Sequence, residues 1–192
     1  MSRPGLQAAT DGLARHLARD EWMPAWRIAD HAHRGQTRDD GKTPFLAHPV
    51  RVAAEVARAG GTPEAVRLAL LHDVLEDSAT EGPRRHAEAM ALQDGTLTHL
   101  LALTKQPGER LDDYYRRVAA AGPLAVAVKV EDRLDNILDM AGWGPGRRGR
   151  YLVDTALRLQ PLADAMAPAS RAKALRQATW SAANRLQAGR RY

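Results

Sequence analysis

The stretch LLHDVLEDS, residues 70–78, places four ionisable side chains between His72 and Asp77 in a segment that otherwise reads as a buried helix. From Pro63, a favourable first residue of a helix, the run PEAVRLALLHDVLED carries apolar side chains on nearly every face. We therefore expect His72 and Asp73 to lie deep in the fold. A buried charge is costly unless it is paired or bound to a metal.

The spacing of these side chains indicates whether they form a structural contact in the core or a metal centre. His72 and Glu76 are four residues apart, as are Asp73 and Asp77, so a helix would gather all four groups on adjoining strips. A histidine that hydrogen-bonds within the core would explain one such residue. Three carboxylates beside it repel one another unless a cation lies among them. The pattern therefore predicts a metal centre.

A second polar strip lies in PLAVAVKVEDRLDNILDM, residues 123–140. Lys129, Asp132, Arg133 and Asn136 recur at spacings of three and four and so share one helix face. The flanking positions are Val, Ala, Leu and Ile, which leaves little room for a solvated side. We expect this strip to line a cavity.

A third element is the loop HRGQTRDDGKTPFLAHPV, residues 33–50, in which His48 precedes Pro49 at an expected helix start. Together with His72, Asp73 and Asp132, His48 would complete a ligand set made only of nitrogen and oxygen. Such a set suits Mn, Fe or another divalent ion and leaves positions for water and substrate.

The rest of the chain predicts an all-α fold. Apolar residues recur at helical spacing from Leu6 to Leu17, from Val50 to Val56 and from Leu97 to Leu103, and no segment alternates strictly as a strand would. A chain of 192 residues with 44% hydrophobic content can bury one substantial core. We expect one domain, residues 1–192, built as a helical bundle.

Composition excludes several classes of function. The absence of cysteine rules out disulfides and thiolate metal sites and fits a reducing compartment. No leader-like apolar segment and no uncharged run of ~20 apolar residues is present, so we expect a soluble cytoplasmic protein without membrane contact. The net charge of +5 permits an anionic partner, but the short basic run at 147–150 lacks interleaved aromatics and does not predict nucleic-acid binding. The oligomeric state stays open.

Five motifs occur in order: HxxQxR at 33–38, GKTPFLAHPVRVA at 41–53, LALLHDVLEDS at 68–78, LTK at 103–105 and KVEDRLDN at 129–136. Together they resemble the HD-type hydrolase domain of RelA/SpoT proteins, above all its stand-alone versions, the small alarmone hydrolases. The similarity runs from about residue 28 to about residue 165. It implies an HD-type bundle with a hydrolase core at 25–165, followed by a C-terminal helix or tail at 168–192.

The resemblance also implies roles for individual residues. The family's metal ligands, usually for Mn²⁺ although another divalent ion is possible, match His48, His72, Asp73 and Asp132. The acidic pair that orients or deprotonates the attacking water matches Glu76 and Asp77. Contacts to the base and sugar match Arg38 and Asn136, and contacts to substrate phosphates match Lys105 and Arg150. Family members remove the 3′-pyrophosphate from ppGpp or pppGpp, giving GDP or GTP. A synthetase domain has no room in 192 residues, so hydrolysis alone is expected.

The sequence departs from the family pattern around these positions. Asp39 and Asp40 follow Arg38, and the motif reads EDRLDN where long RelA/SpoT proteins tend to have ADRLHN, which adds Glu131 and Asp135. Alternative substrates are therefore ppApp, the 2′-phosphate of NADPH or another phosphorylated nucleotide. A module that senses a nucleotide without cleaving it is a further alternative, although a pure sensor would not need the acidic pair.

Overall fold

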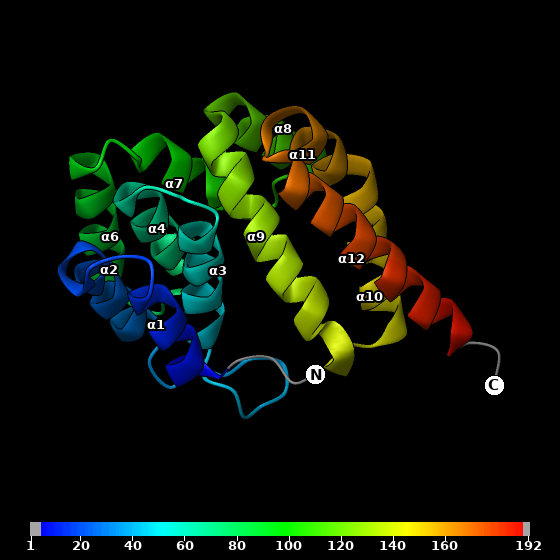
Figure 1. Ribbon diagram of the computed structural model, residues 1–192, viewed down its shortest axis with the longest axis horizontal. Coiled ribbons are helices and arrows are strands. Elements are labelled where there is room, and N and C mark those ends of the chain that lie inside the picture. The colour runs from blue at the N-terminus through cyan, green and yellow to red at the C-terminus, as the bar shows by residue number, and fades with distance from the viewer. Residues whose placement is uncertain (1–4, 190–192) are drawn as a thin grey trace.

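The computed structural model describes residues 5–189 of the chain, and the regular structure in that range is helical apart from one isolated antiparallel bridge between Thr37 and Pro44. The prediction of an all-α fold is confirmed. The helices, labelled in Figure 1, are α1 Leu6–Ala14, α2 Arg19–Ala32, α3 Ala47–Arg58, α4 Pro63–Leu71, α5 Val74–Asp77, α6 Glu81–Gln93, α7 Leu97–Leu103, α8 Leu111–Ala121, α9 Pro123–Asp139, α10 Pro145–Asp154, α11 Gln160–Met166 and α12 Ala169–Ala188. A 3-10 turn, Met140–Gly142, follows α9, and a π-helical segment, Thr155–Leu159, joins α10 to α11.

Helix α9 is the central element of the fold. Figure 1 shows it running diagonally between α1 to α7 on one side and α10 to α12 on the other. It contacts α3, α4 and α7, and also α8, α11 and α12. Val128 packs into the core formed by α1 to α7, whereas Val126 and Val130 pack into a second core formed with α8 to α12. Two faces of α9 are therefore apolar, each packed into one core. The polar strip lies on a third face, between the two cores.

The segment 63–77 is not the continuous helix that its apolar pattern predicts. Thr62 caps the start, its Oγ1 accepting a hydrogen bond from the Ala65 N–H at 3.3 Å, but α4 ends at Leu71 and α5 begins at Val74. In between, His72 Nδ1 lies 2.7 Å from the Ala69 carbonyl oxygen, the group that pairs with the N–H of residue 73 in an uninterrupted helix. The His-Asp pair therefore occupies a turn, with apolar helices on both sides.

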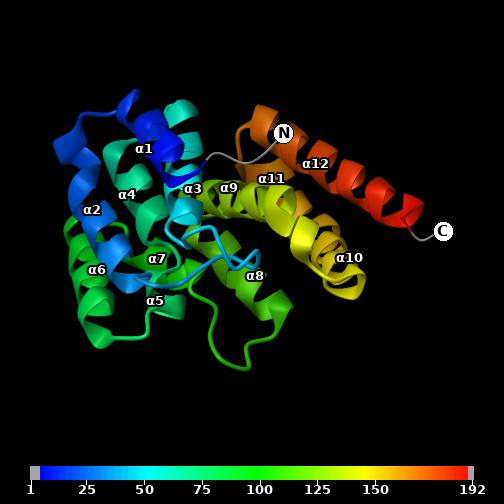
Figure 2. The same ribbon diagram turned by 90° about the horizontal axis from the view of Figure 1, so that it is seen from below.

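The loop between α2 and α3 folds back on itself and reaches towards α9, as Figure 2 shows from below. Main-chain hydrogen bonds join Arg38 N–H to Thr43 O at 2.8 Å and Phe45 N–H to Gln36 O at 3.0 Å. Asp40 closes the turn, because its carboxylate accepts from the N–H groups of Lys42 and Thr43 and from the Thr43 hydroxyl. The loop is thus ordered by its own contacts and presents Arg38 to α9.

The C-terminal part of the described chain is the long helix α12, which packs against α9, α10 and α11. Within residues 5–189, no helix combines the length and the apolar character that crossing a membrane requires. The predicted division into a single domain 1–192, with a core at 25–165 and a C-terminal helix or tail at 168–192, stays a prediction. Residues 1–4 and 190–192 lie outside the described range.

Candidate functional site

Four side chains from three parts of the chain meet: His48 at the start of α3, His72 and Asp73 in the turn after α4, and Asp132 on α9. His48, Asp73 and Asp132 also line a pocket. His48 Nε2 lies 3.4 Å from Asp73 Oδ2 and 3.2 Å from Asp132 Oδ1. His72 Nε2 lies 3.2 Å from Asp73 Oδ1 and 3.8 Å from Asp132 Oδ1. One donor atom each from His48, His72 and Asp73 falls within a span of 4.8 Å.

Both imidazoles turn Nε2 towards this cluster because their other ring nitrogen is engaged elsewhere. His72 Nδ1 faces the Ala69 carbonyl oxygen, which can only accept, so Nδ1 carries the proton. His48 Nδ1 lies 2.8 Å from Asp135 Oδ2. His72 Nε2 is fully buried and has no hydrogen-bond partner among residues 5–189. A buried nitrogen that makes no hydrogen bond but faces carboxylates, with an N/O donor set around it, fits a divalent cation.

Electrostatics in the cluster also favour a cation. Burial alone would lower the pKa of His72, but the charges of Asp73 and Asp132 outweigh it and raise that pKa to about 9. Burial would raise the pKa of Asp132, yet Lys129 and the imidazoles hold it well below its usual range. Lys129 Nζ lies 2.6 Å from Asp132 Oδ2. The carboxylates therefore stay ionised and hold positive charge, which a metal ion would supply in place of an imidazole proton.

The acidic pair Glu76 and Asp77 lies at the mouth of the same pocket, which has a volume of about 400 Å³. Glu76 Oε2 accepts a hydrogen bond from the Lys105 N–H at 3.0 Å, which anchors the loop after α7. Partial burial, followed by the charges of Asp73 and Glu76, raises the pKa of Asp77 to about 6. These carboxylates sit beside the cluster and are not paired with a cationic side chain in any contact described for them, so they remain available to water.

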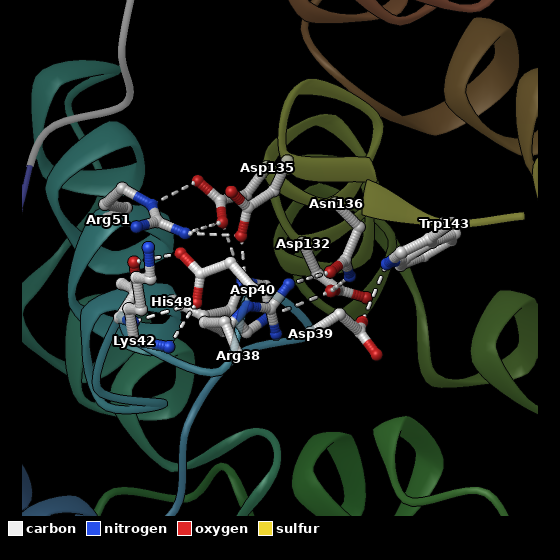
Figure 3. A network of polar contacts seen from close by, with 12 residues as sticks. Arg38, Asp39, Asp40, Lys42, His48, Arg51, Asp132, Asp135, Asn136 and Trp143 are labelled. Atoms are coloured by element: carbon white, nitrogen blue, oxygen red, sulfur yellow. Dashed lines mark hydrogen bonds and ion pairs between the residues drawn. The ribbon is translucent and has the colours of Figure 1, made fainter. Parts of the chain in front are cut away.

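Arg38 and Asn136 join the cluster through one polar network (Figure 3). The Arg38 guanidinium donates to Asp139 Oδ2 at 3.1 Å and to Asn136 Oδ1 at 2.6 Å, and it lies over the Phe45 ring. Asn136 Nδ2 in turn donates to Asp132 Oδ1 at 2.6 Å. The structure thus connects the two residues expected at the nucleoside to a residue of the cluster.

Lys105 and Arg150 line a neighbouring pocket of about 390 Å³. The two pockets share several lining residues, namely Glu76, Lys129, Arg133, Arg147 and Tyr151. Sequence reasoning missed Arg147 and Tyr151, which lie on α10. The available signal was the basic run at 147–150, which faces this pocket with Arg147 and Arg150.

The acidic departures from the family pattern have partners inside the protein. Asp39 accepts from the Trp143 indole N–H at 2.7 Å and from the Arg147 guanidinium at 2.9 Å, seen for Trp143 in Figure 3. Glu131 pairs with Arg171 of α12, away from the cluster. The added negative charge around the pocket is therefore offset by neighbouring cations and donors.

Comparisons with known proteins agree with this picture. No family model matches the chain. It is 29% identical over 174 residues to the guanosine-3′,5′-bis(diphosphate) 3′-pyrophosphohydrolase of Aquifex aeolicus, covering 85% of this chain and 25% of that protein. It is 33% identical over 144 residues to the protein of the same name from Haemophilus influenzae, covering 71% of this chain and 21% of that protein. The chain therefore spans about a quarter of the length of these relatives or less.

A solved structure supports the fold. The structure described as a metazoan ortholog of SpoT that hydrolyzes ppGpp matches with a TM-score of 0.71 at 22% identity, covering 84% of this chain and 94% of that one. The HD-type fold that the motifs imply is thus confirmed. The predicted site residues lie together in that fold, while the role of each stays a prediction.

Proposed function

We propose that this chain, which shares the HD-type fold and sequence similarity with RelA/SpoT hydrolase domains, is a metal-dependent (p)ppGpp 3′-pyrophosphohydrolase. The observation that carries the proposal is the convergence of His48, His72, Asp73 and Asp132 beside the acidic pair, at a pocket that cationic side chains also line. The curated relatives with this activity in their names support the choice of substrate. We expect the protein to act in the cytoplasm.

In the proposed reaction, His48, His72, Asp73 and Asp132 would hold a divalent ion, with Mn²⁺ as our first choice. Such an ion lowers the pKa of water and polarises a phosphoryl oxygen. Glu76 accepts the proton of the attacking water, and Asp77 holds that water in line with the phosphorus nearest the ribose. The water oxygen bonds to this phosphorus as the bond between the phosphorus and the ribose 3′ oxygen breaks. The proton that Glu76 accepted passes to the 3′ oxygen, and pyrophosphate and the nucleoside 5′-phosphate product are released.

The two adjoining pockets suit a nucleotide with two separate phosphate groups. We place the 3′-pyrophosphate at the cluster, where Lys129 lies beside Asp132, and the 5′ phosphates against Lys105 and Arg150. Arg38 and Asn136 then face the base and sugar. Cationic side chains around both pockets offset the high negative charge of such a substrate.

The proposal is tested by a product assay on ppGpp, ppApp and NADPH side by side, with Mn²⁺ added and Asp73→Asn as the blank. We expect pyrophosphate release from ppGpp that is absent in the blank. Release from ppApp alone, or phosphate release from NADPH, would move the activity to that substrate. Mn²⁺ binding without any product would instead favour a sensing module.

The pH dependence of turnover follows from Asp77. An ionised carboxylate accepts a stronger hydrogen bond from water than the protonated acid does. Because the pKa of Asp77 is raised to about 6, kcat at saturating Mn²⁺ should fall as the pH drops below that value. A bound cation favours the ionised form and would move the midpoint downwards. The measurement is a kcat profile of wild type against Asp77→Asn. An Asp77→Asn variant with the wild-type rate and the same acid limb would remove Asp77 from the mechanism.

A further inference from the structure

A buried ion pair lies directly behind His48, on the side away from the ligand cluster. Arg51 of α3 and Asp135 of α9 are 84 positions apart in sequence, and both are almost wholly enclosed, with side chains 4% and 3% exposed. The pair is bidentate: Arg51 Nε donates to Asp135 Oδ1 at 2.8 Å, and Arg51 Nη2 donates to Asp135 Oδ2 at 2.8 Å. The carboxylate plane is therefore fixed at both oxygens.

The same carboxylate holds the His48 ring. Asp135 Oδ2 lies 2.8 Å from His48 Nδ1, and because an ionised carboxylate can only accept, the imidazole donates. This leaves the Nε2 lone pair directed at Asp73 and Asp132, 3.4 and 3.2 Å away. An imidazole that binds a metal commonly donates its other N–H to such a carboxylate, which fixes the tautomer and the ring plane.

The stability of the fold alone does not explain why a charged pair, Arg51 and Asp135, is buried behind His48. A buried ion pair is often no more stabilising than well-packed apolar residues of similar volume, since both ions lose their hydration. Either charge alone would be strongly destabilising. Arg51 is thus what allows an ionised carboxylate to stand against His48 inside the protein.

The pair also reaches the nucleoside side of the pocket. Arg51 Nη2 donates to Asp139 Oδ2 at 3.2 Å, and the same oxygen accepts from Arg38 Nε at 3.1 Å. Figure 3 shows this network extending from His48 through Arg51 to Arg38. The orientation of His48 is therefore supported by a rigid frame and not by one contact.

We propose that Asp135, locked by Arg51, is the positioning residue for His48 and thereby sets the affinity of the metal centre. The proposal rests on the proposed function only in taking His48 as a metal ligand. It predicts that the pair governs how tightly Mn²⁺ is held even where no nucleotide is present.

The test is a calorimetric titration of the nucleotide-free full chain with Mn²⁺, together with thermal unfolding. In Arg51→Met/Asp135→Leu both charges and the acceptor are gone, so the fold should survive while Mn²⁺ affinity falls about 10- to 100-fold. Asp135→Asn keeps one oxygen acceptor and should lie between this variant and wild type.

The matched control is Arg67→Met/Asp94→Leu. Arg67 and Asp94 form another bidentate pair, at 2.7 and 2.8 Å, but this pair joins the α4 surface to the end of α6 and bonds Glu64 and the Glu21 carbonyl instead of a histidine. Its loss should lower the melting temperature without changing Mn²⁺ affinity.

Equal Mn²⁺ affinity in wild type and Arg51→Met/Asp135→Leu would overturn the proposal and leave the pair a purely structural feature. So would wild-type protein that binds no Mn²⁺, which would also remove the proposed function. Wild type that binds Mn²⁺ but releases no pyrophosphate would defeat the proposed function alone, because the ranking of Mn²⁺ affinities still decides the role of Asp135.

Discussion

Replacement of His72 by alanine is expected to abolish divalent-cation binding and pyrophosphate release together. His72 Nε2 is buried, makes no hydrogen bond to any described residue and lies 3.2 Å from Asp73 Oδ1, and alanine would leave no nitrogen at this position. We expect Mn²⁺ affinity to fall by more than the ~10–100-fold that the loss of an outer partner costs. Turnover should drop to the background rate.

The measurement is Mn²⁺ titration and product release on the same preparations, with His99→Ala as the control. His99 is a half-buried histidine on α7 that lines neither pocket, so its removal should leave Mn²⁺ affinity and turnover unchanged. Because deleting a buried ring can also unfold a protein, Asp73→Asn serves as a nearly isosteric second variant. Undiminished Mn²⁺ binding in both variants would show that the cluster is not the metal centre.

The sequence predicts much of this arrangement because burial and helical period are local properties. The apolar positions around Val126, Val128 and Val130 require α9 to be enclosed on two sides, which leaves its polar strip to a cavity. The same reasoning placed His72 in the interior, where its side chain is 2% exposed, whereas Asp73, expected equally deep, is 20% exposed because it lines the pocket. The apolar pattern did not predict that the helix breaks at His72 and Asp73. His72 itself keeps an αR backbone, and the break accompanies a contact between the His72 side chain and the Ala69 carbonyl oxygen, which the apolar pattern does not reveal.

Partners distant in sequence were beyond such reasoning. Asp135 reads locally as one more acid near the cluster, and only the fold shows that Arg51, 84 positions earlier, meets it. Asp39 likewise finds Trp143 and Arg147 more than a hundred positions later. Extra acids that look unfavourable in a motif are therefore accommodated by cations that the motif does not contain.

Replacement of Glu76 by glutamine is expected to separate chemistry from metal binding. Glu76 is exposed at the pocket mouth and its Oε2 accepts the Lys105 N–H, a contact that the amide oxygen of glutamine can keep. The loop and Lys105 should therefore stay in place, and Mn²⁺ affinity should remain close to wild type. What the variant loses is a group that can take a proton from water, so kcat should fall by ~10²-fold or more.

The matched control for this variant is Glu109→Gln in the same loop. Glu109 also accepts a main-chain N–H, from Gln106 at 3.0 Å, but it pairs with Arg117 and lies outside both pockets. Measured together, the two variants distinguish loss of a base from disturbance of the loop: a shared fall in kcat would point to the loop. Full turnover in Glu76→Gln would transfer the proton acceptor to Asp77, whose pKa of about 6 also suits that task near neutral pH.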